Sequence, residues 1–216
     1  MKHLQTLDPL LRLPRHRHAE PYAALVLSGG YVEAGDAGRR RLAAGDVVFH
    51  HAFEAHANVV AGAGARVLNL PLKSIRGAAA FGRVSDADAI ARVAEHDAAA
   101  AGEMLLARAA CAECEVLDWP DLLAHELRSG SSVPLAEWAR RHRMAAATVS
   151  RSFRSVFGVS PKRYRLEQHA LAALQLLALG TTSIADTALV AGFCDQAHLS
   201  RTIRMLTGRT PRSWRR

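Results

Sequence analysis

The sequence predicts a multi-domain α and β protein, with a β domain at the N-terminus, a helical segment in the middle and an all-α domain at the C-terminus. Three observations support this order. Short apolar runs separated by glycine-containing turns fill the first third of the chain, alanine-rich and leucine-rich stretches follow from residue 85, and the remainder carries an internal repeat. We therefore expect domains at residues 1–83, 84–130 and 131–216.

The first domain is expected to be a small β-sandwich or β-barrel. Apolar runs at residues 24–27, 47–49 and 67–70 are typical of buried strands. Gly29-Gly30 and residues 35–38 are expected to form turns between strands. Several short strands at regular spacing are the pattern of sandwiches and barrels.

The middle segment is expected to be helical. Residues 85–88 (Ser-Asp-Ala-Asp) form a helix start signal, and Trp119-Pro120 opens a second helix through Leu127. An apolar stripe follows the first start signal and consists of Ile90, Val93, Met104 and Leu105. Residues 129–132 are expected to form the linker to the last domain, and the helical segment is expected to pair with its copy in a homodimer.

The formal net charge of +8 is concentrated in the last domain. Residues 1–130 carry 14 Lys and Arg against 16 Asp and Glu, whereas residues 131–216 carry 14 against 4, a net charge of +10. Such an excess in one segment is typical of proteins that bind a polyanion such as nucleic acid. The alternative is a solvated face of arginines without a partner.

Composition excludes other classes of protein. Half of the residues are hydrophobic and 22% are charged, which is typical of a globular chain and not of a disordered or fibrous one. No uncharged apolar run reaches the roughly 20 residues that span a bilayer. The N-terminus lacks the apolar core of a secretory signal, and three cysteines cannot all pair within one chain. We therefore expect a cytoplasmic protein that does not associate with membranes.

The last domain contains a unit that is present twice. Residues 150–153 (Ser-Arg-Ser-Phe) recur as residues 200–203 (Ser-Arg-Thr-Ile), and residues 158–161 (Gly-Val-Ser-Pro) recur as residues 208–211 (Gly-Arg-Thr-Pro). Each unit reads as a short helix, a turn and a second helix, which ends where Gly provides a left-handed cap and Pro prevents continuation. The pattern predicts two helix-turn-helix units.

The second helix of each unit is expected to bury one face and expose the other. The predicted buried residues are Val149, Phe153, Val156, Leu199 and Ile203. The predicted DNA-binding residues on the opposite faces are Ala147, Ser150, Arg151, Arg154, Gln196, Ala197, Ser200, Arg201 and Arg204. Arg and Gln can form paired hydrogen bonds with guanine and adenine edges in the major groove. The alternative is that the arginines are only solvated or form salt bridges within their helices.

Several of these residues together resemble the signature of the AraC/XylS family of transcription regulators. They are Ile184-Ala185, residues 192–196, Leu199-Ser200-Arg201, Gly208, Thr210-Pro211 and Arg215. The resemblance covers about residues 133–216. It implies two helix-turn-helix units, joined by a long helix at residues 161–179, that read successive major grooves of double-stranded promoter DNA. It also implies an N-terminal sensory domain for a small-molecule or metal effector, and it allows contact with RNA polymerase.

The first unit departs from the family pattern at its turn. Arg143 and Ala145 stand where the family commonly has Gly and a Ser N-cap. We call the second helix of each unit its reading helix, and we expect the reading helix of the first unit to be less ordered than that of the second. Asp195 supplies a side-chain acceptor at the equivalent place in the second unit. In the connecting helix, His169 stands where Arg is expected.

The β domain carries a histidine pattern that resembles the metal motif of cupins. His16 and His18 lie on one face of a strand, and His56 from a later strand can supply a third nitrogen ligand for a divalent metal ion. The match is partial, because Tyr22 or Ala23 takes the place of the motif's Glu. The alternative is a cupin-like sensory domain in which these histidines contact an effector or lie at the surface.

Two further pairs suggest sites less strongly. Cys111 and Cys114 have the spacing of a zinc or redox pair. No second pair accompanies them, so they are expected to be bystanders. His50-His51 is likewise not expected to form a site.

Together these features predict a transcription regulator without enzymatic activity, in which a ligand or metal ion in the barrel controls DNA binding. One alternative is a metal-dependent cupin enzyme with a helical appendage, which turnover by the isolated barrel would establish. Another is an architectural DNA-binding protein whose barrel only mediates dimerisation. Ligand-dependent changes in DNA binding would distinguish that protein from a regulator.

Overall fold

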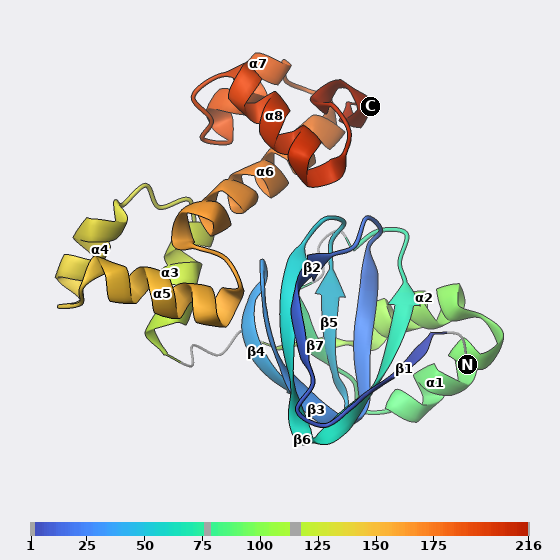
Figure 1. The fold of residues 1–216 in the computed structure, drawn as a ribbon. Helices are drawn as coiled ribbons and strands as arrows, with labels where there is room; N and C mark the ends of the chain where they lie inside the picture. Colours follow the sequence, from blue (N-terminus) through green and yellow to red (C-terminus); the bar gives the residue numbers. More distant parts are fainter. Residues whose placement is uncertain (1–2, 76–78, 113–117, 216) are drawn as a thin grey trace. The chain divides into compact units, whose positions relative to one another are not determined.

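The computed structural model describes residues 3–75, 79–112 and 118–215, and it contains two compact units (Figure 1). The first unit comprises residues 1–121 and the second residues 122–216. The first consists mainly of β-strands and the second of α-helices, so the predicted N-terminal β domain and C-terminal all-α domain are confirmed. In the described part of the chain, no helix combines the length and apolar character needed to cross a membrane.

In its described residues, the first unit is built on an eight-stranded antiparallel sheet. Its strands are β1 (Leu4–Leu7), β2 (Arg12–Arg17), β3 (Tyr22–Gly35), β4 (Gly38–Ala43), β5 (Asp46–His50), β6 (Ala55–Pro71), β7 (Phe81–Arg83) and β8 (Ala110–Cys111). The main path through the sheet is β1-β6-β3-β5-β7-β8, while β2 pairs with β6 and β4 pairs with β3. The two longest strands, β3 and β6, therefore form the centre to which the shorter strands are attached.

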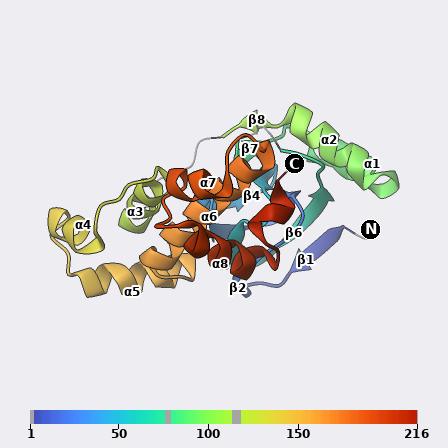
Figure 2. The same cartoon turned by 90° about the horizontal axis from the view of Figure 1, so that it is seen from above.

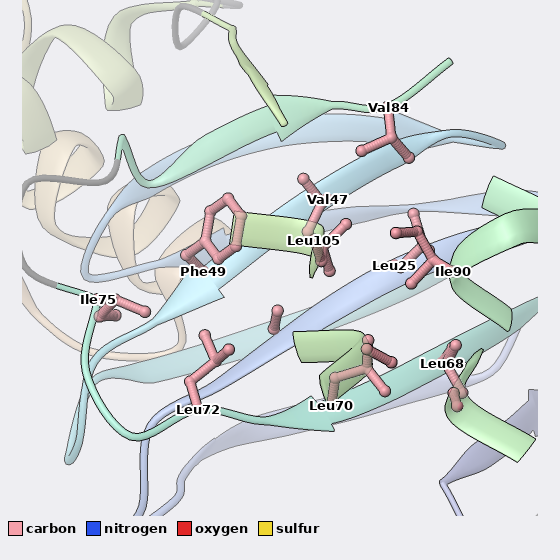
Figure 3. Packing of buried hydrophobic residues seen from close by; sticks show 13 residues of the cluster. Leu25, Val47, Phe49, Leu68, Leu70, Leu72, Ile75, Val84, Ile90 and Leu105 are labelled. Atoms are coloured by element: carbon pink, nitrogen blue, oxygen red, sulfur yellow. The ribbon is translucent and has the colours of Figure 1, made fainter. Parts of the chain in front are cut away.

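Alternation along the strands divides the apolar side chains between the two faces of the sheet. Leu25 and Val47 lie in a cluster that includes helical residues such as Ile90 (Figure 3). Their neighbours Val26 and Val48 lie in a second cluster, formed almost entirely by strand residues. Because successive strand residues point to opposite faces, one face packs against helices and the other lines the interior of the β domain.

Gly29 and Gly30 lie inside β3, so the expectation that they form a turn between strands is wrong. Gly29 has a φ of +71°, and the pairing of β3 with β6 shifts register around it. A Cβ atom at Gly29 would lie 2.0 Å from the carbonyl oxygen of Gly64, and one at Gly30 would lie 2.4 Å from that of Leu42. The glycines therefore permit a bulge in β3. The part of β3 before the bulge pairs with β5, and the part after it pairs with β4.

Two helices, α1 (Ala87–His96) and α2 (Ala98–Arg108), lie beside each other in both views of the first unit (Figures 1 and 2). The predicted helix start is confirmed, since the Asp86 side chain accepts a hydrogen bond from Ala89 N–H. The predicted single helix is broken at Asp97. The extended backbone of Asp97 ends α1, and its carboxylate caps α2 by accepting hydrogen bonds from Ala99 and Ala100 N–H.

Both helices belong to the core of the first unit, which differs from the expected separate segment at residues 84–130. Ile90 and Leu105 are completely buried among strand residues. The helix α3 (Trp119–Arg128) starts at the predicted residue, but most of its length lies in the second unit. Pairing of the helical segment with a second copy stays a prediction.

The second unit contains the predicted repeat. The helices α4 (Leu135–Arg141) and α5 (Ala146–Phe157) form one helix-turn-helix, and α7 (Ile184–Val190) and α8 (Gln196–Thr207) form the other. They lie at opposite ends of the connecting helix α6 (Pro161–Leu179), and the chain continues into the short 3₁₀ helix η1 (Pro211–Trp214) (Figures 1 and 2). Gly158 and Gly208 adopt left-handed conformations and end α5 and α8, as predicted.

Helix α3 completes the core of this unit. Leu123 and Leu127 are buried, and the indole Nε1 of Trp138 donates a hydrogen bond of 2.9 Å to Glu126 Oε1. A fragment that began at residue 131 would lose these contacts. Residues 122–216 are therefore the physically justified fragment for experiments on the helical unit.

Candidate nucleic-acid interface and candidate metal centre

The second helix of each helix-turn-helix unit presents the residues predicted to bind DNA on its solvent side. The exposed ones are Ala147, Arg151, Arg154, Gln196, Ala197, Arg201 and Arg204. Ser150 and Ser200 are half-buried at the edges of these faces. The opposite faces are buried through Val149, Phe153 and Phe157 in α5 and through Leu199, Ile203 and Leu206 in α8. Val156, expected in the core, is only half-buried because Phe157 takes that place.

The four arginines of these two faces have no acidic partner within residues 3–75, 79–112 and 118–215. Elsewhere in the same unit, Arg140 forms an ion pair with Glu137 and Arg163 forms one with Glu167. The described contacts therefore give no support to salt bridges within the reading helices. Their guanidinium groups are free to make the paired hydrogen bonds that guanine bases accept.

The turn of the second unit is built for a sharp change of direction. Gly192 has a φ of +81°, and a Cβ atom there would lie 2.8 Å from two atoms of the His169 ring. The ring of His169 thus packs under the turn, at the position where the sequence has a histidine in place of the expected arginine. Asp195 then caps α8, since its carboxylate accepts a hydrogen bond of 2.6 Å from His198 N–H.

The turn of the first unit has the same course with less suitable residues. Arg143 has a φ of +55°, which costs a residue with a Cβ atom more than it costs glycine. Ala145 is the N-cap residue of α5, and no side-chain hydrogen bond caps that helix. Both observations agree with the predicted weakness of the first turn, because one residue adds strain and the other leaves N–H groups without an acceptor.

In the first unit, the three predicted histidines meet at one cavity. The ring centroid of His16 lies 5.1 Å from that of His18 and 4.4 Å from that of His56. The nitrogen atoms with which the three residues could bind a metal ion lie within 4.8 Å of one another. The cavity has a volume of about 700 Å³. Its wall also includes Tyr22 and Asn58, together with apolar side chains of the sheet interior.

Strand pairing explains why the histidines meet. His16 and His56 are register partners in β2 and β6, and a register shift in β2 just before His16 directs its ring to the cavity. Gly35 faces His56 from β3, and a Cβ atom there would lie 2.9 Å from His56 Cβ. Asp36 forms an ion pair with Arg15 and accepts a hydrogen bond of 2.7 Å from the backbone of β6. These contacts tie together the strands that carry the histidines.

Glu33 and His50 also belong to this region, although neither was predicted to do so. Their side chains form an ion pair, with 3.5 Å between Glu33 Oε2 and His50 Nε2. Together with His56 they form a second group whose ligand atoms lie within 4.8 Å of one another. Tyr22, at the place of the motif's Glu, lies with its hydroxyl 3.4 Å from His56 Nε2. The site therefore has a carboxylate, but it comes from a later position of the same strand, β3.

The bulge in β3 explains why this carboxylate is hard to predict. Before the bulge, Tyr22 and Ala24 face the cavity, whereas after it Tyr31 and Glu33 do. Strict alternation from Ala24 would place Glu33 on the opposite face. The only signal in the sequence is the pair of glycines at residues 29 and 30, which favours a bulge as well as a turn.

Burial and neighbouring charges set the protonation of this cluster. Burial, together with the charges of His50 and His16, lowers the pKa of His56 to about 2, so His56 is neutral at physiological pH. Burial also opposes protonation of His50, but the carboxylates around it, above all Glu33, outweigh burial and raise its pKa. The pKa of His18, whose ring is only partly covered, is lowered by this partial burial and by His16 and His50. Neutral imidazoles have a lone pair that a metal ion can use.

Comparison with known proteins concerns mainly the helical unit. A family model described as a helix-turn-helix domain matches residues 136–216, which include both repeated units. The virulence regulon transcriptional activator VirF of Yersinia enterocolitica is 38% identical over 77 residues, which are 36% of this chain and 28% of that protein. The C-terminal unit is an AraC/XylS-type helix-turn-helix domain. The HTH-type transcriptional regulator ExsA of Pseudomonas aeruginosa matches this AraC/XylS-type domain with the same identity and coverage.

A solved structure gives a further comparison for the AraC/XylS-type domain. The crystal structure of a transcriptional regulator with an AraC-type DNA-binding domain from Chromobacterium violaceum has a TM-score of 0.40 and 26% identity, covering 43% of this chain and 85% of that one. The chain spans less than a third of the length of the curated relatives it matches. The sequence matches concern the helix-turn-helix domain alone, and the activity of the whole protein is a separate question.

The weak first turn of the AraC/XylS-type domain leads to a prediction. Ala145→Ser should stabilise α5 by about 0.5–2 kcal/mol, because the hydroxyl can accept a hydrogen bond from a free N–H group of the first turn. Hydrogen exchange of the full chain should show slower exchange along residues 146–156. Asp195→Ala, which removes the existing cap, should speed exchange along residues 196–206. Unchanged exchange along α5 after Ala145→Ser would show that packing of Val149 and Phe153 already fixes the helix.

The cysteines contribute no described site. Cys111 lies exposed in β8, and Cys194 is exposed in the turn of the second helix-turn-helix. Cys114, its predicted companion in a zinc or redox pair, lies outside the described residues. The interpretation of Cys111 and Cys114 as bystanders stays a prediction.

Proposed function

We propose that this protein is a sequence-specific, DNA-binding transcription regulator whose N-terminal barrel binds a small-molecule or metal effector. The observation that carries the proposal is the repeated presentation of exposed arginines on α5 and α8, at equivalent positions of two helix-turn-helix units and without acidic partners among the described residues. A single exposed arginine is common on any helix. Two equivalent faces of Ser and Arg, in a unit with a net charge of +10, are what recognition of two major-groove segments requires.

The relatives support this role for the matched region. VirF carries the name of a transcriptional activator and ExsA that of a transcriptional regulator. By analogy, double-stranded promoter DNA is the proposed partner, with RNA polymerase as a further one. We also propose a homodimer that acts in the cytoplasm.

Genome-wide occupancy of the full chain in its own host tests the proposal. A regulator should give discrete sites upstream of genes, and the products of these genes would indicate the chemistry of the effector. An architectural DNA-binding protein, in contrast, should cover the genome broadly, because phosphate contacts alone carry no sequence information. Broad coverage without discrete sites would therefore contradict the proposal.

For the barrel, we propose that His16, His18 and His56 hold one divalent metal ion. The residues fit such an ion, because the nitrogen atoms converge within 4.8 Å and the buried Nδ1 of His56 has no hydrogen-bond partner in the described part of the chain. A bound ion would supply a positive charge and open coordination positions for a small effector. The half-buried His16 and exposed His18 place these positions within reach of solvent.

His18→Ala should remove the metal ion from the purified full chain. Elemental analysis of protein prepared without chelators should give close to one divalent ion per chain before the substitution, and much less after it. His51→Ala is the matched control, because His51 lies next to the cluster but belongs to neither ligand group. Absence of stoichiometric metal from the unmodified protein would instead indicate that the histidines contact an organic effector. Turnover of a small molecule by the metal-loaded barrel would favour the cupin-enzyme alternative.

A further inference from the structure

The cluster in the barrel contains one buried group of donors that the proposed three-histidine site does not use. We infer that Glu33, His50 and His56 form a second, inner metal site that selects harder divalent ions such as Mn²⁺ and Fe²⁺. This inference rests on the proposed metal-binding function of the barrel. It shares His56 with the outer site of His16, His18 and His56, so a bound ion would occupy one set or the other.

The inner site differs from the outer one in depth. Its three residues come from β3, β5 and β6, and each of them is at most 3% exposed. In the outer site, His16 is half-buried and His18 is exposed. Donors around one ion with bonds of about 2.0–2.2 Å lie roughly 3–4 Å apart. Ligand atoms already within 4.8 Å of one another are therefore close to that arrangement in both sets.

Two nitrogen atoms of the inner set lack the partners that buried atoms normally have. His56 Nδ1 is buried and has no hydrogen-bond partner in the described residues, and His50 Nε2 is buried with no partner there that meets hydrogen-bond distance. The nearest acidic oxygen, Glu33 Oε2, lies 3.5 Å from His50 Nε2, which is an ion-pair distance and long for a hydrogen bond. More than nine in ten buried polar groups are hydrogen-bonded, so the unpaired Nδ1 of His56 beside the loosely paired His50 and Glu33 favours a ligand shared by the three side chains.

The donor chemistry of the two sets predicts which ions each prefers. Three imidazoles suit zinc, nickel and copper, whereas carboxylate oxygen suits manganese and other harder ions. Two histidines with one carboxylate are the ligand set of many iron(II) sites. The Glu33 charge would also offset part of the ion's charge where water is excluded, which a set of neutral imidazoles cannot do. The identity of the ion would therefore decide whether it binds at the surface of the cavity or inside it.

Equilibrium dialysis of the full chain with Mn²⁺ and with Zn²⁺ tests the inference. Glu33→Gln keeps the shape of the side chain and should weaken Mn²⁺ binding at least tenfold while changing Zn²⁺ binding less than threefold. His18→Ala should weaken Zn²⁺ binding at least tenfold while changing Mn²⁺ binding less than threefold. His56→Ala should weaken the binding of both ions. His50→Gln provides a second test of the inner set if Glu33→Gln impairs folding, and thermal unfolding of each variant identifies such a defect.

The outcomes separate the inner site from the proposed function. Zn²⁺ binding that depends on His18, together with Mn²⁺ binding unaffected by Glu33→Gln and His50→Gln, would overturn the inner site and leave the outer one standing. Equal losses of both ions in Glu33→Gln would mean one combined site and would also overturn the inference. Binding of neither ion by the unmodified chain would contradict the proposed metal-binding function itself.

Discussion

Raising the salt concentration from 50 to 200 mM is expected to weaken binding of duplex DNA by residues 122–216 about a thousandfold. These residues carry 15 Lys and Arg against 5 Asp and Glu, and they form a compact unit. If about six of the basic side chains contact phosphates, counterion release gives a slope near −5 in a plot of log K against log salt concentration. Fluorescence anisotropy with a labelled duplex measures this slope directly.

Residues 1–121 provide the control for the salt experiment. They carry 13 Lys and Arg against 15 Asp and Glu, and the part of them that the structure describes holds neither of the two helix-turn-helix units, so they should not bind the duplex at either salt concentration. Salt-insensitive binding by residues 122–216, or no binding at 50 mM salt, would contradict the assignment of this unit as the DNA-binding part.

Arg201→Ala is expected to weaken binding to a specific DNA site by about 5- to 150-fold, which corresponds to about 1–3 kcal/mol, with little effect on random DNA. The reason is the position of Arg201, which is exposed on α8 and has no acidic partner in the described residues. A guanidinium group in that position can form two hydrogen bonds with one guanine, and alanine can form none. Competition titrations with specific and random duplexes measure the loss of affinity for each kind of DNA.

Arg140→Ala is the matched control for Arg201→Ala. Arg140 is also exposed and removes the same charge when replaced, but it lies on α4 and is paired with Glu137. Arg140→Ala should change the two affinities little. Equal losses on specific and random DNA in Arg201→Ala would reassign Arg201 to a phosphate contact.

The helical unit could be predicted from sequence in detail because its boundaries depend on local chemistry. Gly158, Pro161 and Gly180 set the limits of α5 and α6 through backbone conformations that other residues disfavour. The exposed and buried faces of α5 and α8 follow from helical periodicity alone. The packing of α3 with Trp138 was not predictable in this way, since it joins residues that no local pattern connects.

The β domain was less predictable because its site depends on bulges. His16, His18 and His56 were predicted from spacing, and the structure brings them together. Glu33 was missed, since a register shift in β3 reverses which of its side chains face the cavity. His50 lies in β5, and its ion pair with Glu33 joins residues that no local pattern connects. The break between α1 and α2 was missed as well, because Asp97 is compatible with a helix until its carboxylate caps the next one.

The most direct test of the central claim is selection of bound DNA by the full chain from a pool of random-sequence duplexes. Two helix-turn-helix units that read successive major grooves should enrich two blocks of preferred bases, centred about 10 base pairs apart. Arg151→Ala should erase the preferences of one block and Arg201→Ala those of the other. A pool that shows no enrichment, or one block that both substitutions weaken equally, would contradict the account of two separate reading helices.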